Sequence, residues 1–248
     1  MPAPAVLILG GTGEARDLAA RLLAAGVPAV SSLAGRVRDP ALPAGEVRIG
    51  GFGGAAGLAD YLHAHRIRAV VDATHPFAQA ISASAAVACR RTEVPLLRLA
   101  RPGWTGHPLA PTWQWVDDYA QAATAARGDR VLLTTGRTTL RAFADLAAPF
   151  VLVRLVEPAT GPLPAGWAVV TSRGPYTVAG EQALMREHRI EVVITKDSGG
   201  AMTQAKLVAA DRVGARVVVV RRPAPPAGVA NVNDVARAVD WARRRIDR

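Results

Sequence analysis

The fold of this chain is decided by the stretch AVLILGGTGEAR, residues 5–16. Five apolar residues lead into a glycine turn, and a helical pattern then continues to Ala25. A strand that enters a helix through such a turn brings backbone N–H groups and the positive end of the helix dipole to a phosphate. The turn matches G-x-G-x-x-G at Gly11 and Gly13, whereas Arg16 occupies the third glycine position. Two interpretations therefore stay open, a dinucleotide site and a plain tight turn.

Apolar runs typical of strands alternate with helical patterns along the whole chain. Strands are expected near residues 5–9, 28–33, 47–49, 69–73, 95–99, 113–116, 130–134, 150–154, 168–171, 191–195 and 215–220. Helices are expected near residues 13–25, 54–65, 77–91, 117–127, 138–146, 177–189, 203–213 and 231–246. This alternation predicts parallel strands joined by right-handed crossovers. The expected fold class is α/β, with two Rossmann-like doubly wound parallel-sheet domains and an interdomain cleft.

A segment rich in proline and glycine, residues 101–112, interrupts the α/β pattern. Such a composition does not form a regular element, so the segment is interpreted as the crossing between two domains. Residues 1–100 are then expected to form a nucleotide-binding domain and residues 113–248 a second domain on the substrate side. Ligands in such folds bind at the carboxyl ends of the strands, and a cleft between domains favours a substrate.

Composition excludes several kinds of protein. Among the 248 residues, no apolar run approaches the ~20 residues of a membrane span. The short N-terminal apolar stretch follows no basic region, so a cytoplasmic location is expected. The single Cys89 excludes an internal disulfide, and the five histidines lie apart from any acid or cysteine cluster, so no metal site is expected.

The formal net charge of +10 is compatible with nucleic acid, an anionic surface or a polyanionic small molecule. The basic residues are scattered, and aromatic residues make up only 5% of the chain. That fraction is too small for a base-stacking platform, so nucleic acid is the weakest of these partners.

The end of the second expected strand selects the cofactor in a dinucleotide fold, through an acid for NAD or an arginine for the 2′-phosphate of NADP. No acid occurs here before Asp39. Ser31, Ser32, Arg36 and Arg38 are instead suited to a phosphate. The segment therefore favours NADP, with a solvated loop bearing ordinary arginines as the alternative.

Two further strand ends in the first half carry candidate groups. Residues 50–54 hold four glycines, which implies either a close approach of backbone to a ligand or a structural turn. Asp72, Thr74 and His75 cluster after the strand near 69–73. His75 is interpreted either as a proton donor or ligand-binding group or as part of a capping turn in which Pro76 starts the next helix.

The second half offers three strand ends of the same kind. Residues 134–139 and 171–176 each combine hydroxyl side chains with an arginine, Arg137 and Arg173, which suits an anion site or a capped helix. The stretch TKDSGG, residues 195–200, contains Lys196, one of only two lysines in an arginine-biased chain. A compact ammonium charge is therefore expected to be needed there for its own properties.

These segments together resemble the precorrin-6A reductases of cobalamin biosynthesis and their cobalt-precorrin-6A counterparts. The resemblance rests on ILGGTGEA (8–15), AGR (34–36), DATHPFA (72–78), SRGP (172–175) and TKDSGG (195–200), in the order of that family and over nearly the full chain.

The resemblance implies NADPH-dependent reduction of one double bond of precorrin-6A to give precorrin-6B (dihydroprecorrin-6A), without a metal. It implies that arginines pair with the acetate and propionate groups of the macrocycle. Lys196 is the expected catalytic residue, with Asp197 or His75 as a proton relay. Cofactor contacts are expected at Gly10, Gly11, Thr12, Gly13, Glu14, Ser32, Gly35, Arg36, Gly51 and Thr74. Substrate contacts are expected at Arg137, Ser172, Arg173, Ser198 and Gly199.

Two other functions stay open at this point. One is another NADP-dependent reductase of a small anionic substrate, and the other is a non-catalytic module that senses NADP. The expected partner is a polycarboxylate tetrapyrrole, with no nucleic acid and no membrane. A monomer and transient contact with neighbouring pathway enzymes are both compatible with the sequence.

Overall fold

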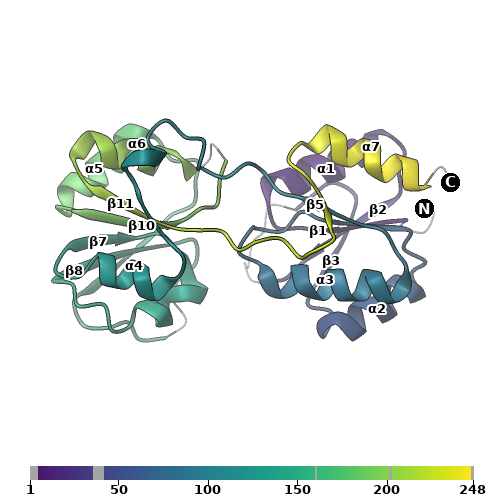
Figure 1. Cartoon of the computed structure of the whole chain (residues 1–248), viewed down its shortest axis with the longest axis horizontal. Helices are drawn as coiled ribbons and strands as arrows, with labels where there is room; N and C mark the ends of the chain where they lie inside the picture. Colours follow the sequence, from purple (N-terminus) through teal and green to yellow (C-terminus); the bar gives the residue numbers. More distant parts are fainter. Residues whose placement is uncertain (1–4, 36–41, 160, 201–202, 247–248) are drawn as a thin grey trace. The chain divides into compact units, whose positions relative to one another are not determined.

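The computed structural model describes residues 5–35, 42–159, 161–200 and 203–246. The chain divides into two units, Met1–Pro102 with Pro223–Arg248, and Gly103–Arg222. Each unit is a parallel six-stranded sheet with helices on both faces (Figure 1). The α/β class with two doubly wound parallel sheets is therefore confirmed.

The sheet of the first unit has the strand order β3-β2-β1-β4-β5-β12. Its strands are β1 (Val6–Leu9), β2 (Ala29–Leu33), β3 (Glu46–Ile49), β4 (Ala69–Asp72), β5 (Leu96–Leu99) and β12 (Ala230–Val232). Its helices are α1 (Gly13–Ala24), α2 (Gly54–Ala64), α3 (Gln79–Thr92) and α7 (Val235–Ile246). The order reverses between β1 and β4, which is where a doubly wound sheet binds its ligand.

Alternation along β1 explains the layers of this unit. Val6 and Ile8 pack into a core with α1 and α7, which includes Ala238 and Ala242 of α7. Leu7 belongs to a second core on the opposite face, against α2 and α3. Successive side chains of a strand point to opposite faces, so a strand that is apolar throughout is covered on both sides. Figure 1 shows the two helix pairs on the two faces of the sheet.

The sheet of the second unit has the strand order β9-β8-β7-β10-β11-β6. Its strands are β6 (Gln114–Val116), β7 (Arg130–Leu133), β8 (Phe150–Leu155), β9 (Trp167–Thr171), β10 (Val192–Lys196) and β11 (Arg216–Val220). Its helices are α4 (Tyr119–Ala125), α5 (Val178–Glu187) and α6 (Ala205–Val213), with short 3-10 turns η1 (Ala110–Thr112) and η2 (Arg137–Phe143). Leu132, Val193 and Val217 pack against α5 and α6 in its main core.

The expected second domain, residues 113–248, does not match the structure at its C-terminal end. Strand β12 pairs with β5, and α7 packs in the core of the first unit, so residues 223–248 belong to that unit and not to the second. The segment expected to be one helix over 231–246 contains the end of β12 and then α7. Strand β6 pairs with β11 and provides the sixth strand of the second sheet.

Two expected helices also differ from the structure. The segment near 138–146 is the 3-10 turn η2, which starts after Gly136 at a φ of 89°. Helix α3 begins at Gln79 and not at Pro76, because residues 75–78 form a separate turn closed by the bond from Ala78 N to His75 O (2.8 Å).

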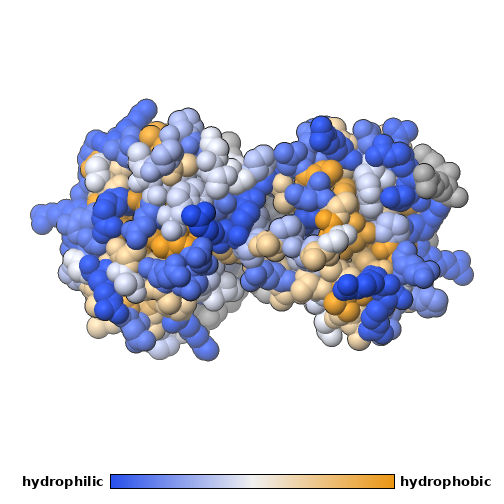
Figure 2. Space-filling model, in the orientation of Figure 1, coloured by the Kyte–Doolittle hydropathy of each residue, from blue (hydrophilic) through white to orange (hydrophobic). Residues whose placement is uncertain are grey.

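No helix in the described part of the chain is long and apolar enough to cross a membrane. Figure 2 shows hydrophilic residues over much of the visible surface of both units, with apolar residues in separate small patches.

Candidate active site

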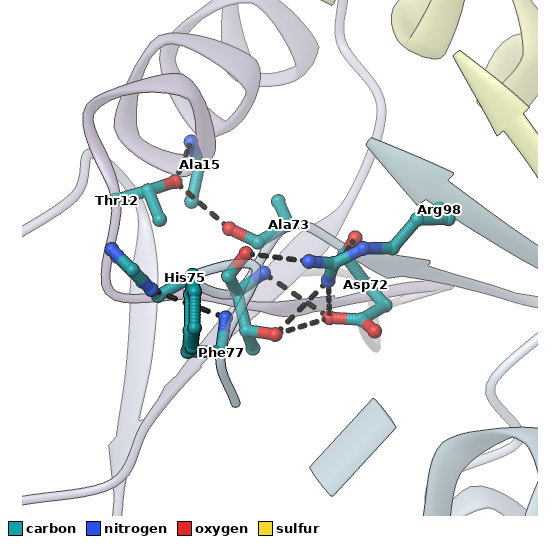
Figure 3. Close-up of polar contacts among 8 residues, drawn as sticks. Thr12, Ala15, Asp72, Ala73, His75, Phe77 and Arg98 are labelled. Atoms are coloured by element: carbon teal, nitrogen blue, oxygen red, sulfur yellow. Dashed lines mark hydrogen bonds and ion pairs between the residues drawn. The ribbon is translucent and has the colours of Figure 1, made fainter. Parts of the chain in front are cut away.

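The glycine turn after β1 places the start of α1 at the reversal point of the first sheet. Gly11 has a φ of 111°, a conformation that favours glycine. Thr12 caps α1, since its Oγ1 accepts a hydrogen bond from Ala15 N (3.1 Å) and donates one to Ala73 O (2.8 Å) after β4 (Figure 3). The N–H groups of Gly13 and Glu14 have no partner within the helix, as in every α-helix. This N-terminus suits a phosphate.

A buried ion pair fixes the loop after β4. Arg98 of β5 and Asp72 are 4% and 2% exposed, and Arg98 Nη1 lies 2.6 Å from Asp72 Oδ1. Arg98 also donates to Thr74 Oγ1 and to Thr74 O, both at 3.0 Å, while Asp72 Oδ1 accepts from Thr74 N and Oγ1 (Figure 3). A buried charge persists only when it is paired. Thr74 is therefore held in place beside the glycine turn.

His75 follows this network and forms a turn. Its Nδ1 accepts a hydrogen bond from Phe77 N at 3.2 Å (Figure 3). The proton of the neutral ring then lies on Nε2. This contact confirms a turn at His75 but not a helix start at Pro76, and proton donation through Nε2 stays a prediction.

The other expected cofactor residues lie along the same sheet edge. Glu14 pairs with Arg101 at 2.9 Å, so its carboxylate stabilises the segment that leaves the first sheet. Gly35, at a φ of 69°, packs close to Ile49, since a Cβ there would lie 3.1 Å from Ile49 Cγ2. Arg36 lies outside the described residues.

Ser32 and Gly51 contact an arginine that the sequence interpretation overlooked. Arg48 donates to Ser32 Oγ (2.8 Å), to Gly50 O (2.9 Å) and to Gly51 O (3.1 Å). Its guanidinium also lies 3.9 Å from the centroid of the Phe52 ring. The four-glycine segment is thus tied to the ends of β2 and β3 through one cation.

The second unit brings Lys196 to the corresponding reversal point between β7 and β10. Thr134 N and Thr134 Oγ1 both donate to Ile194 O, at 2.9 and 3.0 Å. A Cβ built on Gly136 would lie 4.0 Å from Lys196 Nζ. The stretch after β7 therefore contacts the end of β10. Burial lowers the pKa of Lys196 to about 8.

The second lysine of the chain, Lys206 in the first turn of α6, lies beneath this site and was overlooked in the sequence. Its Nζ lies 5.1 Å from the centroid of a Trp104 ring. Burial lowers the pKa of Lys206 to about 7, with a further lowering by Arg154 and Lys196 and a partial compensation by Glu181. Arg154 and Glu181 themselves form a buried ion pair at 2.8 Å.

Asp197 is held by the two points at which the chain enters and leaves the second unit. Its Oδ1 accepts from Trp104 N (2.9 Å), and its Oδ2 accepts from Arg222 Nε (3.0 Å). A Cβ on Gly103 would lie only 2.6 Å from Asp197 Oδ2, so the residue there has to be glycine for this contact. The geometry favours an anchoring role next to Lys196 over the expected proton relay.

The remaining expected substrate residues are spread along the edge of the second sheet. Arg137 is half-buried at the start of η2, whereas Arg173 is exposed after the edge strand β9. Ser172 O accepts from Tyr176 Oη at 2.9 Å. Ser198 Oγ lies 3.4 Å from Thr203 Oγ1, and Thr203 Oγ1 also donates to Gly199 O at 3.4 Å. These contacts form one polar loop after β10.

No group of three histidine, cysteine or acidic side chains among the described residues is placed to hold a metal ion. Hydroxyl groups and arginines lie near the carboxyl ends of strands in both units, and the acids Asp72 and Asp197 there are paired with Arg98 and Arg222. Such an arrangement is suited to anions.

Comparisons with known proteins agree with this geometry. The family model "Precorrin-6x reductase CbiJ/CobK" matches residues 5–243. The chain is 52% identical over 239 residues to the precorrin-6A reductase of Rhodococcus erythropolis, which covers 95% of this chain and 96% of that relative. It is 34% identical over 239 residues to the cobalt-precorrin-6A reductase of Salmonella typhimurium, with 89% and 88% covered. The solved structure "CobK precorrin-6A reductase" matches with a TM-score of 0.88 at 41% identity, covering 97% and 96%.

Proposed function

The chain belongs to the precorrin-6x reductase family CbiJ/CobK, and on this premise we propose that it reduces precorrin-6A to precorrin-6B with NADPH in cobalamin biosynthesis. One structural observation carries the proposal. The capped N-terminus of α1 follows the central strand β1, at the point where the strand order of the first sheet reverses. A dinucleotide pyrophosphate binds at that position in sheets of this order.

The residues present fit a dinucleotide. Gly11 adopts a positive φ with no heavy atom within 4 Å of a built Cβ, so backbone is open to a ligand there. Thr12 fixes the start of α1 against β4, which keeps the N–H groups of Gly13 and Glu14 directed outward from the helix end. NADPH supplies the hydride when it is bound.

The second unit would hold the macrocycle through its carboxylates. Arg137 is half-buried in the segment after β7 and Arg173 follows β9, and these two strands lie two strand spacings, about 10 Å, apart. Cations at that separation suit a large polycarboxylate better than a small acid. We assign to Lys196 the stabilisation of electron density that develops on the conjugated ring, since a fixed charged donor acts on developing charge.

The decisive experiment is incubation of the purified protein with precorrin-6A and NADPH. The nicotinamide absorbance and the macrocycle spectrum should change together. One equivalent of NADPH should be oxidised for each equivalent of macrocycle that is reduced. Arg137→Ala and Arg173→Ala should raise the Michaelis constant for the macrocycle and leave the NADPH affinity nearly unchanged. Loss of NADPH affinity in both variants would reverse the assigned roles of the two units.

The alternatives give different results in the same assay. A non-catalytic NADP sensor would bind NADPH with no turnover of any tetrapyrrole. Another reductase would oxidise NADPH with a small carboxylic substrate and leave the macrocycle spectrum unchanged.

A further inference from the structure

We propose that Arg48, with Phe52 beneath its guanidinium, forms the site that recognises the 2′-phosphate of the adenosine half of the cofactor. The inference rests on the proposed function and assigns to a residue of β3 the role that was expected for Arg36 in the loop after β2. Nothing in the linear pattern separates Arg48 from the other arginines of the chain. Its contacts do.

Arg48 is held in one orientation before any ligand arrives. Three of its hydrogen bonds go to neutral oxygens, Ser32 Oγ, Gly50 O and Gly51 O, at 2.8, 2.9 and 3.1 Å. The ring of Phe52 supports the guanidinium at 3.9 Å. A guanidinium carries five N–H bonds in one plane, so these three acceptors leave N–H groups at its edge for an anion.

The charge of Arg48 is not balanced within the described part of the chain. Every ion pair given for those residues joins other partners, whereas Arg48 contacts only neutral acceptors and aromatic rings. An anion at the remaining N–H groups of Arg48 would add charge-assisted hydrogen bonds to those that already hold the guanidinium. The buried arginines Arg98 and Arg154 of the same chain do have carboxylate partners, at 2.6 and 2.8 Å.

The position of Arg48 matches the length of an adenosine unit. In the sheet order β3-β2-β1, Arg48 pairs in register with Ser32 of β2, and β2 pairs with β1. Adjacent strands lie about 4.8 Å apart, so the end of β3 is about 10 Å from the glycine turn after β1. A nucleotide whose pyrophosphate lies at α1 extends its adenosine across β2 toward this arginine.

The glycine segment next to Arg48 is open on its outer side and fixed on its inner side. A Cβ built on Gly50 or Gly51 meets no heavy atom within 4 Å, which leaves room for a flat base. A Cβ on Gly57 of α2 would collide with Phe52 O, so the helix and the segment pack in direct contact. The support under the Arg48 guanidinium is therefore rigid.

The test compares two nucleotide fragments that differ mainly in the 2′-phosphate, adenosine 2′,5′-bisphosphate and adenosine 5′-monophosphate. Their dissociation constants are measured by calorimetry for the full-length protein and for Arg48→Met, Arg48→Lys and Arg90→Met. Arg90 is an exposed arginine of α3 and is the charge-matched control. We expect the preference for the bisphosphate to fall at least tenfold in Arg48→Met, to fall less in Arg48→Lys, and to persist in Arg90→Met.

The outcomes separate the inference from the function on which it rests. An unchanged preference for the bisphosphate in Arg48→Met would overturn the role of Arg48. An equal loss of affinity for both fragments would also overturn it, because that result indicates a collapsed loop and not a lost phosphate contact. A wild-type protein that binds NADPH and NADH equally would also overturn it. A wild-type protein that binds neither dinucleotide would instead refute the proposed function itself.

Discussion

Five strands follow the same order in the two units, β3-β2-β1-β4-β5 and β9-β8-β7-β10-β11, and the units differ at the point where that order reverses. In the first unit, β1 leads through a glycine turn into α1, a full α-helix capped by Thr12. In the second unit, β7 leads through Gly136 into the 3-10 turn η2, which has no side-chain cap. A long helix concentrates backbone N–H groups and a dipole at its start, whereas a 3-10 turn does so weakly.

The second unit has side-chain cations where the first has a helix end. Lys196 lies against Gly136 at the reversal point, and Arg137 follows directly. Under the proposed function, the two units would bind their anions in different ways. Backbone donors at a fixed helix end suit a compact phosphate, while separate long side chains suit carboxylates spread over a large ring.

The strongest test of this comparison removes one buried arginine from each unit. Arg98→Met leaves the carboxylate of Asp72 buried without its cation, and Arg154→Met does the same to Glu181. Each should lower the free energy of unfolding by about 3–5 kcal/mol in urea titrations. Only Arg98→Met should also abolish NADPH binding, because Arg98 holds Thr74 beside the glycine turn.

A control variant removes an exposed ion pair in place of a buried one. Arg21→Met removes the exposed pair with Asp17, whose side chains are 53% and 45% exposed. Exposed pairs contribute little, so its unfolding should match that of the parent protein. An Arg98 variant that unfolds no more easily than this control would show that the buried pair is not what stabilises the loop.

A second test uses the buried lysine that only the second unit has. Folding lowers the pKa of Lys206 from 10.5 to about 7, so the unfolded chain binds more protons between these values and stability rises with pH. Relative to Lys206→Met, the parent protein should gain about 2 kcal/mol of unfolding free energy between pH 7 and 9. Urea titrations at several pH values measure it, and parallel curves for the two proteins would contradict the buried, neutral lysine.

A third test separates catalysis from binding at Lys196. Lys196→Met keeps much of the length of the side chain and removes its charge. If the ammonium stabilises the transition state, kcat should fall tenfold or more, about 1.4 kcal/mol per decade, with ligand affinities little changed. The parent enzyme should also lose activity above pH 8, where Lys196 loses its proton, and the variant should lack that limb. A change in the Michaelis constants alone would make Lys196 a binding residue.

The smallest expected effect compares one helix cap from each unit. Thr12 caps α1 and Thr177 caps α5, both through a hydrogen bond of 3.1 Å from a backbone N–H. Either change to Ala should lower stability by about 1 kcal/mol, measured by thermal unfolding. Only Thr12→Ala should weaken NADPH binding in a fluorescence titration. Equal effects on NADPH would remove the functional difference between the two helix starts.

The sequence was sufficient for all strands but one, whereas the predicted site residues stay predictions. Apolar runs with β-branched residues predicted every strand except β12, since parallel strands buried on both faces are nearly continuous apolar segments. Strand β12 has the burial of an edge strand over Ala230–Val232 and lies directly before α7, so its short pattern merged with that of the helix. Its return to the first sheet depends on pairing with β5, which no local pattern encodes.

The overlooked residues fall into two groups. Arg98 and Arg154 stand inside otherwise apolar strands, where a charge has to find a buried partner. That signal was available, and Asp72 lies in register with Arg98 across β4 and β5. Lys206 and Arg48 carried no comparable signal, because their roles depend on Trp104 and Phe52 coming close in space.

Strand β12, which lies at the end of the chain, completes the first sheet, and this affects the order in which the two units can fold. Residues 103–222 contain all of the second sheet, so that unit has its whole core once its last strand has been synthesised. The first unit lacks β12 and the buried Ala238 and Ala242 of α7 until residues 223–248 follow. Closing its core then joins segments separated by more than a hundred residues, a slow step in loop-closure terms. The unit made first is therefore expected to be completed last, and its apolar β5 edge to depend longest on protection by chaperones.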